Sequence, residues 1–434
     1  MKIKDIIKST KGKLVGIIDE NDTYRKIKID SNEVKENDIF VAIVGENNDG
    51  HNYINEAIKN KAKLIITSRK VNSKIPYIIV KDTTVALSNI AKAYLKKYRP
   101  NVIAITGSVG KTTTRNILLK LLKTKYNTVA NKKNYNNKIG VPLTIFNINE
   151  NTEILILEIG MNHLKEISYL SKLVKPNVSA ITNIGTSHIG YLENKENILK
   201  AKLEILDGMK EKILFVNGDD KLLRKIKNTK KSGFSKVNNL KGYDLKSSLY
   251  KSTFKIKYNE KEYKIDVPVQ KHLTTNVMLA INIALYYKID IKDIIKELKD
   301  YKAFDMRMNI IKTKNNTIIN DCYNSSFESL TSILKIIKEE KKKKLLILGD
   351  IKELGNLSKE IHQSLKPYID KIENKEVILV GKEMENLDVE AQHFKNYQET
   401  IEYLKTKKIK NKLILIKGSR GMKLENITNY LETI

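Results

Sequence analysis

A glycine turn followed by a lysine and three threonines is the part of this chain with the most specific chemistry. The turn spans residues 107–110, an apolar run precedes it, and Lys111 follows it. Glycines let consecutive backbone N–H groups face anionic oxygens, and the start of the next helix adds partial positive charge. The lysine can reach the outer phosphates of a nucleotide, and a threonine hydroxyl can bind magnesium. The predicted phosphate-binding residues are Gly107, Ser108, Val109, Gly110, Lys111, Thr112 and Thr113.

A carboxylate stands at the end of a second apolar run. Residues 154–157 are all aliphatic, and Glu158 follows them. The carboxyl ends of parallel strands meet at one edge of a sheet, so Glu158 is expected close to the phosphates, where its oxygens could hold magnesium. One acidic residue at a strand end would be a weak indication if it stood alone.

The elements that must position these residues follow a repeating pattern. From about residue 100 onward, short runs rich in Ile, Val and Leu alternate with longer helix-like segments, which predicts parallel α/β layers. Strands buried on both faces read as continuous apolar runs. Residues 243–268 alternate in polarity instead, and predict an antiparallel hairpin of strands 253–258 and 262–267. The predicted buried strands are 102–106, 154–159, 179–183, 213–216, 345–348, 377–380 and 413–416.

Three α/β domains are predicted, because 434 residues exceed what one hydrophobic core supports. A strand at 38–44, a helix at 52–60 and a strand at 63–67 indicate a small domain at the start of the chain. Residues 94–101 are interpreted as the linker that follows it, since Pro100 ends the preceding helix. The predicted domains are 1–98, 99–309 and 310–434.

The composition is that of a globular protein, with 41% hydrophobic and 30% charged residues. Cys322 is the only cysteine, which excludes intramolecular disulfides and a cysteine metal cluster. No apolar run has the length of a membrane span, and the amino terminus lacks a signal-peptide core. A cytoplasmic protein without stable membrane insertion is therefore expected.

The basic charge balance could suggest a nucleic-acid or membrane-surface partner. The chain has 80 Lys and Arg against 50 Asp and Glu, a net charge of +30. Only seven of the basic residues are arginine, whose bidentate fork usually carries nucleic-acid recognition, and the lysines are spread over the whole chain. No nucleic-acid partner is expected, although the positive field would attract polyphosphate substrates.

The glycine turn has a short form that narrows its interpretation. Ile105 stands where the common G-x-x-x-x-G-K-[ST] motif has its first glycine, which weakens the prediction of a generic NTPase or kinase. The form T-G-x-x-G-K-T-T resembles the ATP loop of the Mur ligase and folylpolyglutamate synthase superfamily. Residues 159–163, 181–188 and 201–205 also resemble Mur ligase motifs in identity and spacing.

This resemblance implies that Lys111, Glu158, His188 and Lys202 are catalytic. Thr112 and Glu158 would bind one magnesium ion, while His188 and Lys202 would serve a second. Lys202 would act as a carbamate, because an ammonium repels Mg²⁺ whereas CO₂ added to the neutral amine gives an oxygen-donor anion. Taken by itself, Lys202 would be interpreted as a surface residue of a lysine-rich helix.

Further segments resemble particular Mur ligases. Residues 29–31, 38–42 and 48–51 resemble the UDP-binding domain shared by the third and fourth ligases of the family, which implies a UDP contact for Ser31. Residues 134–144 resemble the D-alanyl-D-alanine-adding ligases. That likeness implies substrate contacts for Asn136 and Asn137, whose amides both donate and accept hydrogen bonds.

The second half of the chain continues the resemblance. His272 and, more strongly, Asn276 match adenine-side positions, and Arg307 matches an arginine that approaches the nucleotide from the domain boundary. The D-x-Y-N element at 321–324, residues 349–355 with His362 beyond them, and residues 417–422 complete it. The implied ATP-binding residues here are Asn276, Arg307 and Asp321, and the implied substrate-binding residues are Tyr323, Asn324, Ser419 and Arg420.

The family likeness covers the whole chain and implies its architecture and reaction. It implies a small UDP-sugar-binding domain, a central P-loop-type ATPase domain with a mostly parallel sheet, and a Rossmann-like α/β ligase domain. The implied enzyme is a monomer that uses ATP and two magnesium ions. It would join D-alanyl-D-alanine to UDP-N-acetylmuramoyl-tripeptide through an acyl phosphate, with the third domain closing over ATP.

Two kinds of alternative remain open at the level of the sequence. The chain could be another ligase of the superfamily, either the diaminopimelate-adding Mur ligase or a folylpolyglutamate synthase. The Asp-Asn-Pro-Arg element of the diaminopimelate-adding ligase is absent, which disfavours the former. A non-catalytic nucleotide or nucleic-acid binder is the other alternative, and Glu158, His188 and Lys202 argue against it because a binder needs no second metal site.

Overall fold

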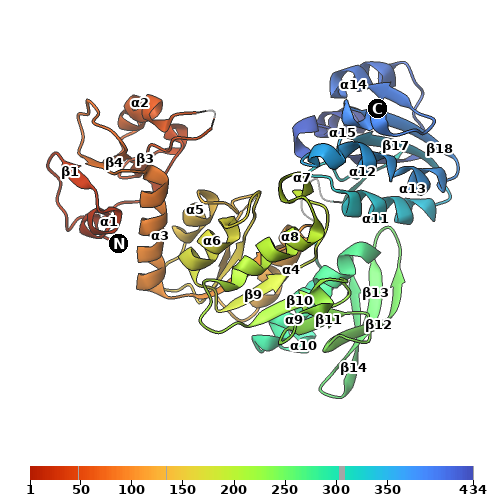
Figure 1. Ribbon diagram of the computed structural model, residues 1–434, viewed down its shortest axis with the longest axis horizontal. Coiled ribbons are helices and arrows are strands. Elements are labelled where there is room, and N and C mark those ends of the chain that lie inside the picture. Colours follow the sequence, from red (N-terminus) through yellow and green to blue (C-terminus); the bar gives the residue numbers. More distant parts are fainter. Residues whose placement is uncertain (47, 133, 303–307, 434) are drawn as a thin grey trace.

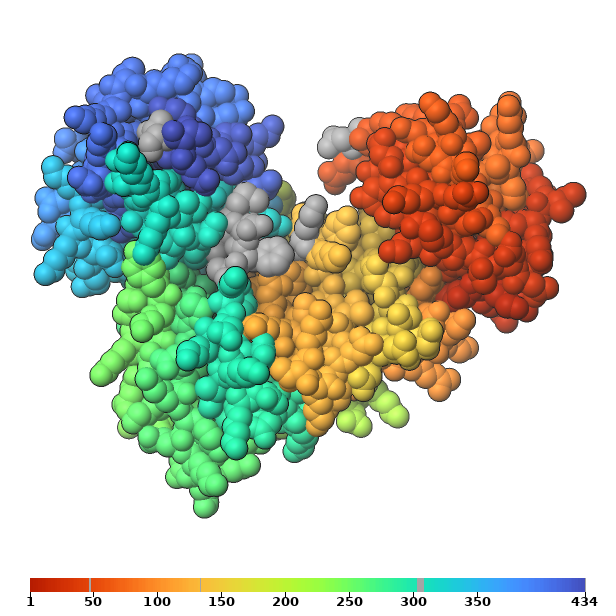
Figure 2. All heavy atoms as spheres, turned by 180° about the vertical axis from the view of Figure 1, so that it is seen from behind, coloured from red at the N-terminus to blue at the C-terminus, as the bar shows by residue number. Residues whose placement is uncertain are grey.

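The computed structural model describes residues 1–434 except 47, 133, 303–307 and 434. The described strands form three separate sheets, one in each domain, so the prediction of a three-domain α/β protein is confirmed. The first and third domains lie on either side of the central one in Figure 1. Figure 2 shows a wide hollow between them, open at the surface of the central domain. The domain limits at 98/99 and 309/310 stay predictions.

The first domain holds a five-stranded sheet, counted over the described residues, in the order β1-β5-β4-β3-β2. Strand β1 is antiparallel to β5, and the remaining pairs are parallel. The long helix α3 leaves this domain and runs down to the central one (Figure 1). The elements are α1 (Ile3–Thr10), β1 (Lys13–Val15), β2 (Ile27–Lys28), β3 (Ile39–Val41), α2 (Ile54–Lys59), β4 (Leu64–Thr67), β5 (Tyr77–Ile79) and α3 (Thr83–Tyr98).

The central domain is built on a nine-stranded sheet, again counted over the described residues, in the order β14-β13-β12-β11-β10-β9-β6-β8-β7. Neighbouring strands are parallel from β7 at one edge of the sheet as far as the pair of β11 and β12. The pairs β12 with β13 and β13 with β14 are antiparallel. The strands are β6 (Asn101–Thr106), β7 (Thr128–Ala130), β8 (Ile154–Glu158), β9 (Val178–Ile181), β10 (Leu214–Asn217), β11 (Lys230–Gly233), β12 (Leu240–Ser247), β13 (Ser252–Tyr258) and β14 (Lys261–Val267). The helices are α4 (Lys111–Leu122), α5 (Gly140–Ile145), α6 (Glu166–Val174), α7 (Ile189–Leu192), α8 (Lys195–Leu203), α9 (Thr274–Tyr286) and α10 (Ile291–Lys299).

The third domain has six described strands in the order β15-β16-β20-β17-β18-β19. Only the pair of β15 and β16 is antiparallel among these strands. The strands are β15 (Asn309–Lys312), β16 (Thr317–Asn320), β17 (Lys343–Gly349), β18 (Lys375–Val380), β19 (Gln392–Phe394) and β20 (Lys412–Lys417). The helices are α11 (Phe327–Lys338), α12 (Ser358–Gln363), α13 (Lys366–Asp370), α14 (Tyr397–Lys405) and α15 (Glu425–Glu432).

The apolar runs of the sequence became buried strands because both faces of each large sheet are covered. In β6, Val102 and Ala104 join one hydrophobic cluster, whereas Ile103 and Ile105 join the cluster on the opposite face. Burial on both sides leaves no exposed position for a polar residue. The predicted hairpin is also confirmed, as β13 and β14 pair antiparallel. Within the described residues, no helix combines the length and the apolar content needed to cross a membrane.

The predicted linker at 94–101 is wrong in most of its length. Helix α3 continues through Tyr94 to Tyr98, and Asn101 already begins β6. The left-handed conformation of Arg99, whose backbone N–H donates to Leu95 O, ends the helix just before Pro100. The proline therefore marks the end of the helix, but a helix and not a loop connects the two domains.

Candidate active site

The glycine turn lies between the end of β6 and the start of α4, in a conformation that requires its glycines. Gly107 has a φ of 149° and Gly110 a φ of 85°, values that side chains disfavour. A Cβ on Gly107 would lie 1.8 Å from Thr182 Oγ1, and one on Gly110 would lie 2.5 Å from the Asn276 side chain. Asn276 thus packs against the turn from α9.

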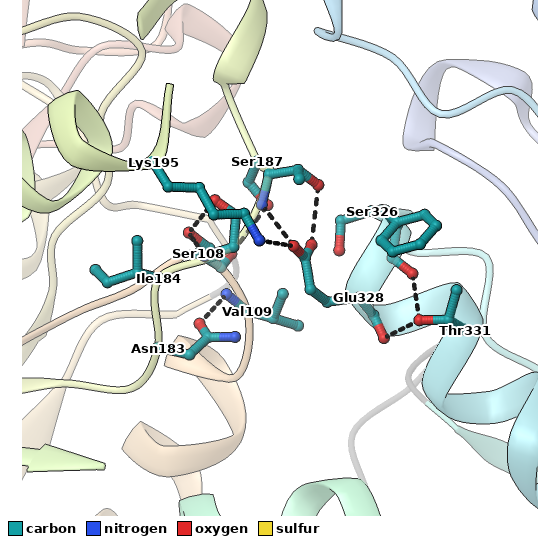
Figure 3. Close-up of polar contacts among 12 residues, drawn as sticks. Ser108, Val109, Asn183, Ile184, Ser187, Lys195, Ser326, Glu328 and Thr331 are labelled. Atoms are coloured by element: carbon teal, nitrogen blue, oxygen red, sulfur yellow. Dashed lines mark hydrogen bonds and ion pairs between the residues drawn. The ribbon is translucent and has the colours of Figure 1, made fainter. Parts of the chain in front are cut away.

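The segment that follows β9 braces the turn from the neighbouring strand. Asn183 accepts hydrogen bonds from Ser108 N at its backbone oxygen (3.1 Å) and from Val109 N at Oδ1 (2.8 Å). Thr182 Oγ1 donates to Val109 O at 2.6 Å, and Gly185 N donates to Ser108 Oγ at 2.9 Å. Figure 3 shows Asn183 beside Val109, with Ser108 above them. Two of the predicted cradle amides therefore already have a partner in the protein.

Lys111 folds back over the same turn. Its Nζ donates to Gly107 O at 2.7 Å and to Ser108 O at 3.2 Å. The ammonium thus sits above the position where the helix start and the turn would receive phosphates. It would exchange these carbonyl oxygens for phosphate oxygens when a nucleotide binds.

Glu158 lies beside the helix start because β8 pairs with β6, with Ile105 opposite Glu158. Its carboxylate is 3% exposed and has three partners. Thr112 Oγ1 donates to Oε2 at 2.8 Å, Asn136 Nδ2 donates to Oε1 at 3.1 Å, and Arg115 Nη1 lies 3.4 Å from Oε2. The hydroxyl and the carboxylate are adjacent oxygen donors, as a shared magnesium ion requires.

Lys202 is the most unusual charged residue of the site. It lies in α8 with 1% of its surface exposed, and no carboxylate of the described residues lies within ion-pair distance of it. Burial, and then the charge of Lys111, lower the pKa of Lys202 well below its ordinary value. Both effects favour the neutral amine over the ammonium.

His188 connects the same region to the third domain. It caps α7 in a left-handed conformation, and its Nδ1 lies 2.7 Å from Glu353 Oε2, although not at hydrogen-bonding angles. Contact with His188, and more weakly the charge of Lys111, hold the pKa of Glu353 below its ordinary value against the opposing effect of burial. No three His, Cys, Asp or Glu side chains gather into a metal site in the described part of the chain. Bound magnesium would therefore need the Thr112 hydroxyl, a modified Lys202 or phosphate oxygens as ligands.

A cavity lies between the central and third domains, next to the glycine turn. His272 in this cavity is half-buried, and its Nδ1, which is itself buried, has no hydrogen-bond partner among the described residues. Burial lowers the pKa of His272 to about 4, with Asp321 opposing the shift and Lys417 reinforcing it, so the ring is neutral at pH 7. The cavity is lined by Val109, Thr182, Asn183, Asn217, His272, Leu273, Thr275, Asn276, Glu328, Ser329 and Ser332.

Family models match the three parts of the chain in order. The Mur ligase family catalytic domain matches residues 23–106, the Mur ligase middle domain 105–284, and the Mur ligase glutamate ligase domain 306–420. A UDP-N-acetylmuramoyl-tripeptide–D-alanyl-D-alanine ligase from Bacillus subtilis is 35% identical to this chain, covering 99% of it and 98% of the relative. The chain belongs to the Mur ligase family.

Solved Mur ligases share the arrangement of all three domains. A crystal structure of MurF from Acinetobacter baumannii covers 100% of this chain and 99% of its own, with 25% identity and a TM-score of 0.91. MurF from Thermotoga maritima, solved in complex with ADP, covers 94% and 97%, with 28% identity and a TM-score of 0.84. The resemblance inferred from the motifs is therefore confirmed over the full length of this Mur ligase.

The predicted residues of the third domain form a group of their own in this Mur ligase. Lys417 Nζ donates to Asp321 Oδ2 at 2.6 Å and to Asn324 O at 3.1 Å. The Arg420 guanidinium lies 5.9 Å from the centre of the Tyr323 ring. Ser419 Oγ accepts a hydrogen bond from Lys352 N. The Asp321 carboxylate faces the central domain closely enough to oppose the lowering of the His272 pKa.

Two predicted residues are not brought to this centre, and a third cannot be placed. Ser31 lies in the first domain, where its hydroxyl donates to Glu56 Oε2 at 2.6 Å. Asn137 Oδ1 accepts from Ile139 N and Gly140 N, so it holds the start of α5. Arg307 lies outside the described residues. The substrate roles of Ser31 and Asn137 stay predictions.

Several residues around the centre of this Mur ligase were missed from the sequence. Arg115 is 1% exposed and lies one helical turn after Lys111, a spacing that could have placed both cations on one face of α4. Asn183 is the last residue of a predicted strand and could have been suspected from its place at the sheet edge. Glu328 and Glu353 reach the site from another domain, and no local pattern indicates that.

Proposed function

We propose that this Mur ligase uses ATP to join D-alanyl-D-alanine to UDP-N-acetylmuramoyl-tripeptide. The observation that carries the proposal is the pairing of Thr112 with Glu158 at 2.8 Å, together with a buried Lys202 whose pKa is lowered by burial and by the charge of Lys111. A protein that only binds nucleotides has no use for such a lysine. The name of the Bacillus subtilis relative supplies the substrates, and the complex of the Thermotoga maritima MurF supports an adenine nucleotide.

The chain offers oxygen donors that fit one magnesium ion. Thr112 and Glu158 would hold it, because their oxygens are already adjacent and Asn136 and Arg115 fix the carboxylate from behind. Magnesium, when bound, would neutralise charge on the transferring phosphoryl group. Lys111 would supply a second positive charge from the turn.

Lys202 is suited to become a carbamate. In its neutral form, which the lowered pKa favours, the nitrogen can attack CO₂ to form an N–C bond, and the proton released goes to solvent. The product is an anion, so the repulsion by Lys111 that now lowers the pKa of Lys202 would turn into attraction. The carbamate oxygens and His188 would then serve a second magnesium ion, with Glu353 orienting the ring from its other nitrogen.

The reaction proposed for these residues has two steps. A carboxylate oxygen of the tripeptide attacks the γ-phosphorus of ATP, and the bond between this phosphorus and the oxygen that bridges it to the β-phosphate breaks. The products are ADP and an acyl phosphate of the tripeptide. The amine of D-alanyl-D-alanine then attacks the acyl carbon, loses a proton, and expels phosphate. Because acyl phosphates hydrolyse, the third domain would have to exclude water from the cavity during the transfer.

The substrates would approach from two domains. We assign the UDP-sugar to the first domain at Ser31, where it would have to compete with the hydrogen bond from Ser31 to Glu56. We assign the peptide end of the same substrate to Asn136, which lies beside Glu158. Tyr323, Asn324, Ser419 and Arg420 are assigned to the substrate on the third domain. We expect the enzyme to be cytoplasmic, since its substrates include ATP. We also expect it to be a monomer.

Phosphate release from ATP tests the proposed function. The full chain is incubated with magnesium, ATP and UDP-N-acetylmuramoyl-tripeptide, with and without D-alanyl-D-alanine. Phosphate release that depends on both acceptor and dipeptide, with formation of the pentapeptide, is expected. Release that needs neither, or that follows a single amino acid instead of the dipeptide, would show that the proposed reaction is wrong.

Replacing Lys202 tests the role of the carbamate. Lys202→Ala is expected to lower turnover at least about a hundredfold, because it removes ligands of a second metal ion, while affinity for ADP changes little. Lys200→Ala is the matched control, since Lys200 is exposed on the same helix. Undiminished turnover of Lys202→Ala would exclude the carbamate, and equal losses in both variants would point to a general effect on α8.

A further inference from the structure

One carboxylate of the third domain reaches into the central domain beside the glycine turn. Glu328 lies in the first turn of α11, and its Oε1 accepts a hydrogen bond from Thr186 N at 2.9 Å. Its Oε2 accepts from Thr186 Oγ1, also at 2.9 Å, and Lys195 Nζ lies 3.4 Å from Oε1. Figure 3 shows this side chain extending from its helix toward Ser187 and Lys195.

The surroundings of this carboxylate are closely fitted. Thr186 is buried, and the Glu328 side chain is 25% exposed. A Cβ on Gly185 would lie 2.8 Å from the carboxylate carbon of Glu328 and 2.9 Å from Oε2. The glycine before Thr186 therefore makes room for a group from another domain.

The helix itself does not need Glu328 in this position. Ser326 caps α11 by accepting from Ser329 N, and Ser326 N in turn donates to Ser329 Oγ. An acidic residue in the first turn also favours the helix dipole, but that effect requires no contact with another domain. Both oxygens of Glu328 are instead used on Thr186.

Thr186 lies between two residues that hold the phosphate-binding turn. Gly185 N donates to Ser108 Oγ at 2.9 Å, and Ser187 Oγ donates to Ser108 O at 3.4 Å. Glu328 also lines the cavity that contains Val109 and Asn276. The Glu328 side chain thus lines the cavity, and it also holds the segment that contacts Ser108 of the glycine turn.

We propose that Glu328 is a positioning residue for the nucleotide. When the third domain is docked, its carboxylate holds residues 185–187, and these hold Ser108 of the glycine turn. Docking and an ordered nucleotide site are coupled in this way through one side chain. The inference rests on the proposed function, because the nucleotide is the ligand assigned to the cavity.

Calorimetric titration with ADP and magnesium tests the coupling on the full chain without turnover. Glu328→Ala is expected to weaken ADP binding about tenfold, because it removes two hydrogen bonds to a charged acceptor. Glu328→Gln keeps an oxygen that can accept from Thr186 N, so its loss should be smaller, about threefold. Glu339→Gln, exposed at the other end of α11, should bind ADP like the unaltered protein.

A second variant locates the path of the effect. Thr186→Val keeps the shape of the side chain and removes the hydroxyl that Glu328 accepts from. If Glu328 acts through Thr186, the double variant Glu328→Ala, Thr186→Val should lose less affinity than the product of the single losses. Small-angle scattering with saturating ADP should also give a larger radius of gyration for Glu328→Ala than for Glu339→Gln.

Each other outcome overturns the inference. Unchanged ADP affinity in Glu328→Ala would show that the contact does not matter, and tighter binding would show that the carboxylate competes with phosphates. Strictly multiplicative losses in the double variant would exclude the path through Thr186. If the unaltered protein binds ADP but fails in the ligation assay, only the proposed function is wrong, whereas failure to bind ADP at all would refute both.

Discussion

The first domain meets the central domain through a packed helix, whereas the third domain meets it through several polar contacts in addition to apolar ones. Helix α3 packs on α1 of the first domain and on α5 and α6 of the central domain. Leu87 and Ile90 are completely buried there. The Tyr94 ring lies 5.1 Å from that of Phe146, and its hydroxyl bonds to that of Tyr24 at 2.8 Å. This junction resembles the interior of a domain.

The contacts of the third domain differ in kind. Glu328 bonds to Thr186, and Glu353 lies against His188. Gly190 N donates to Glu353 O at 3.1 Å, and the backbones of Gly190 and Gly355 touch. Hydrogen bonds of this sort can be exchanged for bonds to water at a small net cost, whereas buried apolar surface cannot.

The difference indicates which attachment is permanent. A ligase must open to bind ATP and to release ADP, and must close to protect an acyl phosphate. The polar contacts at the third domain can break and form again in each reaction cycle. The packed helix α3 instead holds the first domain in a fixed position on the central domain. The first domain is therefore attached permanently, whereas the third domain is attached so that it can open and close.

Truncation of Tyr94 should have the largest effect on stability. Tyr94→Ala removes a ring that is 7% exposed and is expected to cost about 3–5 kcal/mol of unfolding free energy, as for other buried aromatic residues. Chemical denaturation, with hydrogen exchange of the α3 amides, measures the loss. Tyr53→Ala is the control, because Tyr53 is 41% exposed, and should change stability by less than about 0.5 kcal/mol. Equal costs in the two variants would mean that the first junction is not a packed interior.

A side chain at Gly190 should separate the third domain while leaving the first in place. A Cβ there would lie 2.5 Å from Gly355 N and 2.8 Å from Glu353 O, both backbone atoms that cannot turn away. Gly190→Ala should oppose docking by about 1–3 kcal/mol, although alanine favours helix α7 itself. Turnover should fall about tenfold, and the radius of gyration with bound nucleotide should rise.

Gly421→Ala provides the matched control for this change. Among the described residues, no atom beyond its chain neighbours lies within 4 Å of a Cβ built on Gly421, so the scattering curve of Gly421→Ala should match that of the unaltered protein. If Gly190→Ala left the scattering curve unchanged as well, the third domain would not use this contact to dock. If it unfolded the first domain, the two junctions would not be independent.

The sequence predicted most of the sheets, because burial on two faces leaves a visible pattern. Strands β6 and β8 are uninterrupted aliphatic runs and were located to within a residue. The two- and three-residue strands β1, β2, β5, β7 and β19 were missed, since so short a run carries no periodicity. The longer strands β11, β12, β15 and β16 were missed as well. The connection at 94–101 was wrong because tertiary packing on both domains extends α3 beyond what the proline alone suggests.

The sequence named site residues where motifs carry the chemistry, and the family resemblance added Asn136, His188 and Lys202. The glycine turn and Glu158 were found because each follows a buried strand of the same sheet. Glu328 and Thr186 are 142 residues apart in sequence, and their contact depends on how two domains dock. Nothing in the local pattern around Glu328 distinguishes it from an ordinary acidic residue at a helix start.

Removal of the Lys195 ammonium should have the smallest effect on ADP affinity. It tests whether charge attraction or hydrogen bonding holds Glu328 at the junction of the central and third domains. Its side chain is 45% exposed and its Nζ lies 3.4 Å from Glu328 Oε1, so solvent and salt screen the pair. Lys195→Ala should weaken ADP binding less than about fivefold, with Lys200→Ala as the unchanged control. If Lys195→Ala weakened binding as much as Glu328→Ala, and added salt did the same, the junction would depend on charge attraction. A small loss would instead mean that the hydrogen bonds from Thr186, and not the attraction of Lys195, fix Glu328 at the junction.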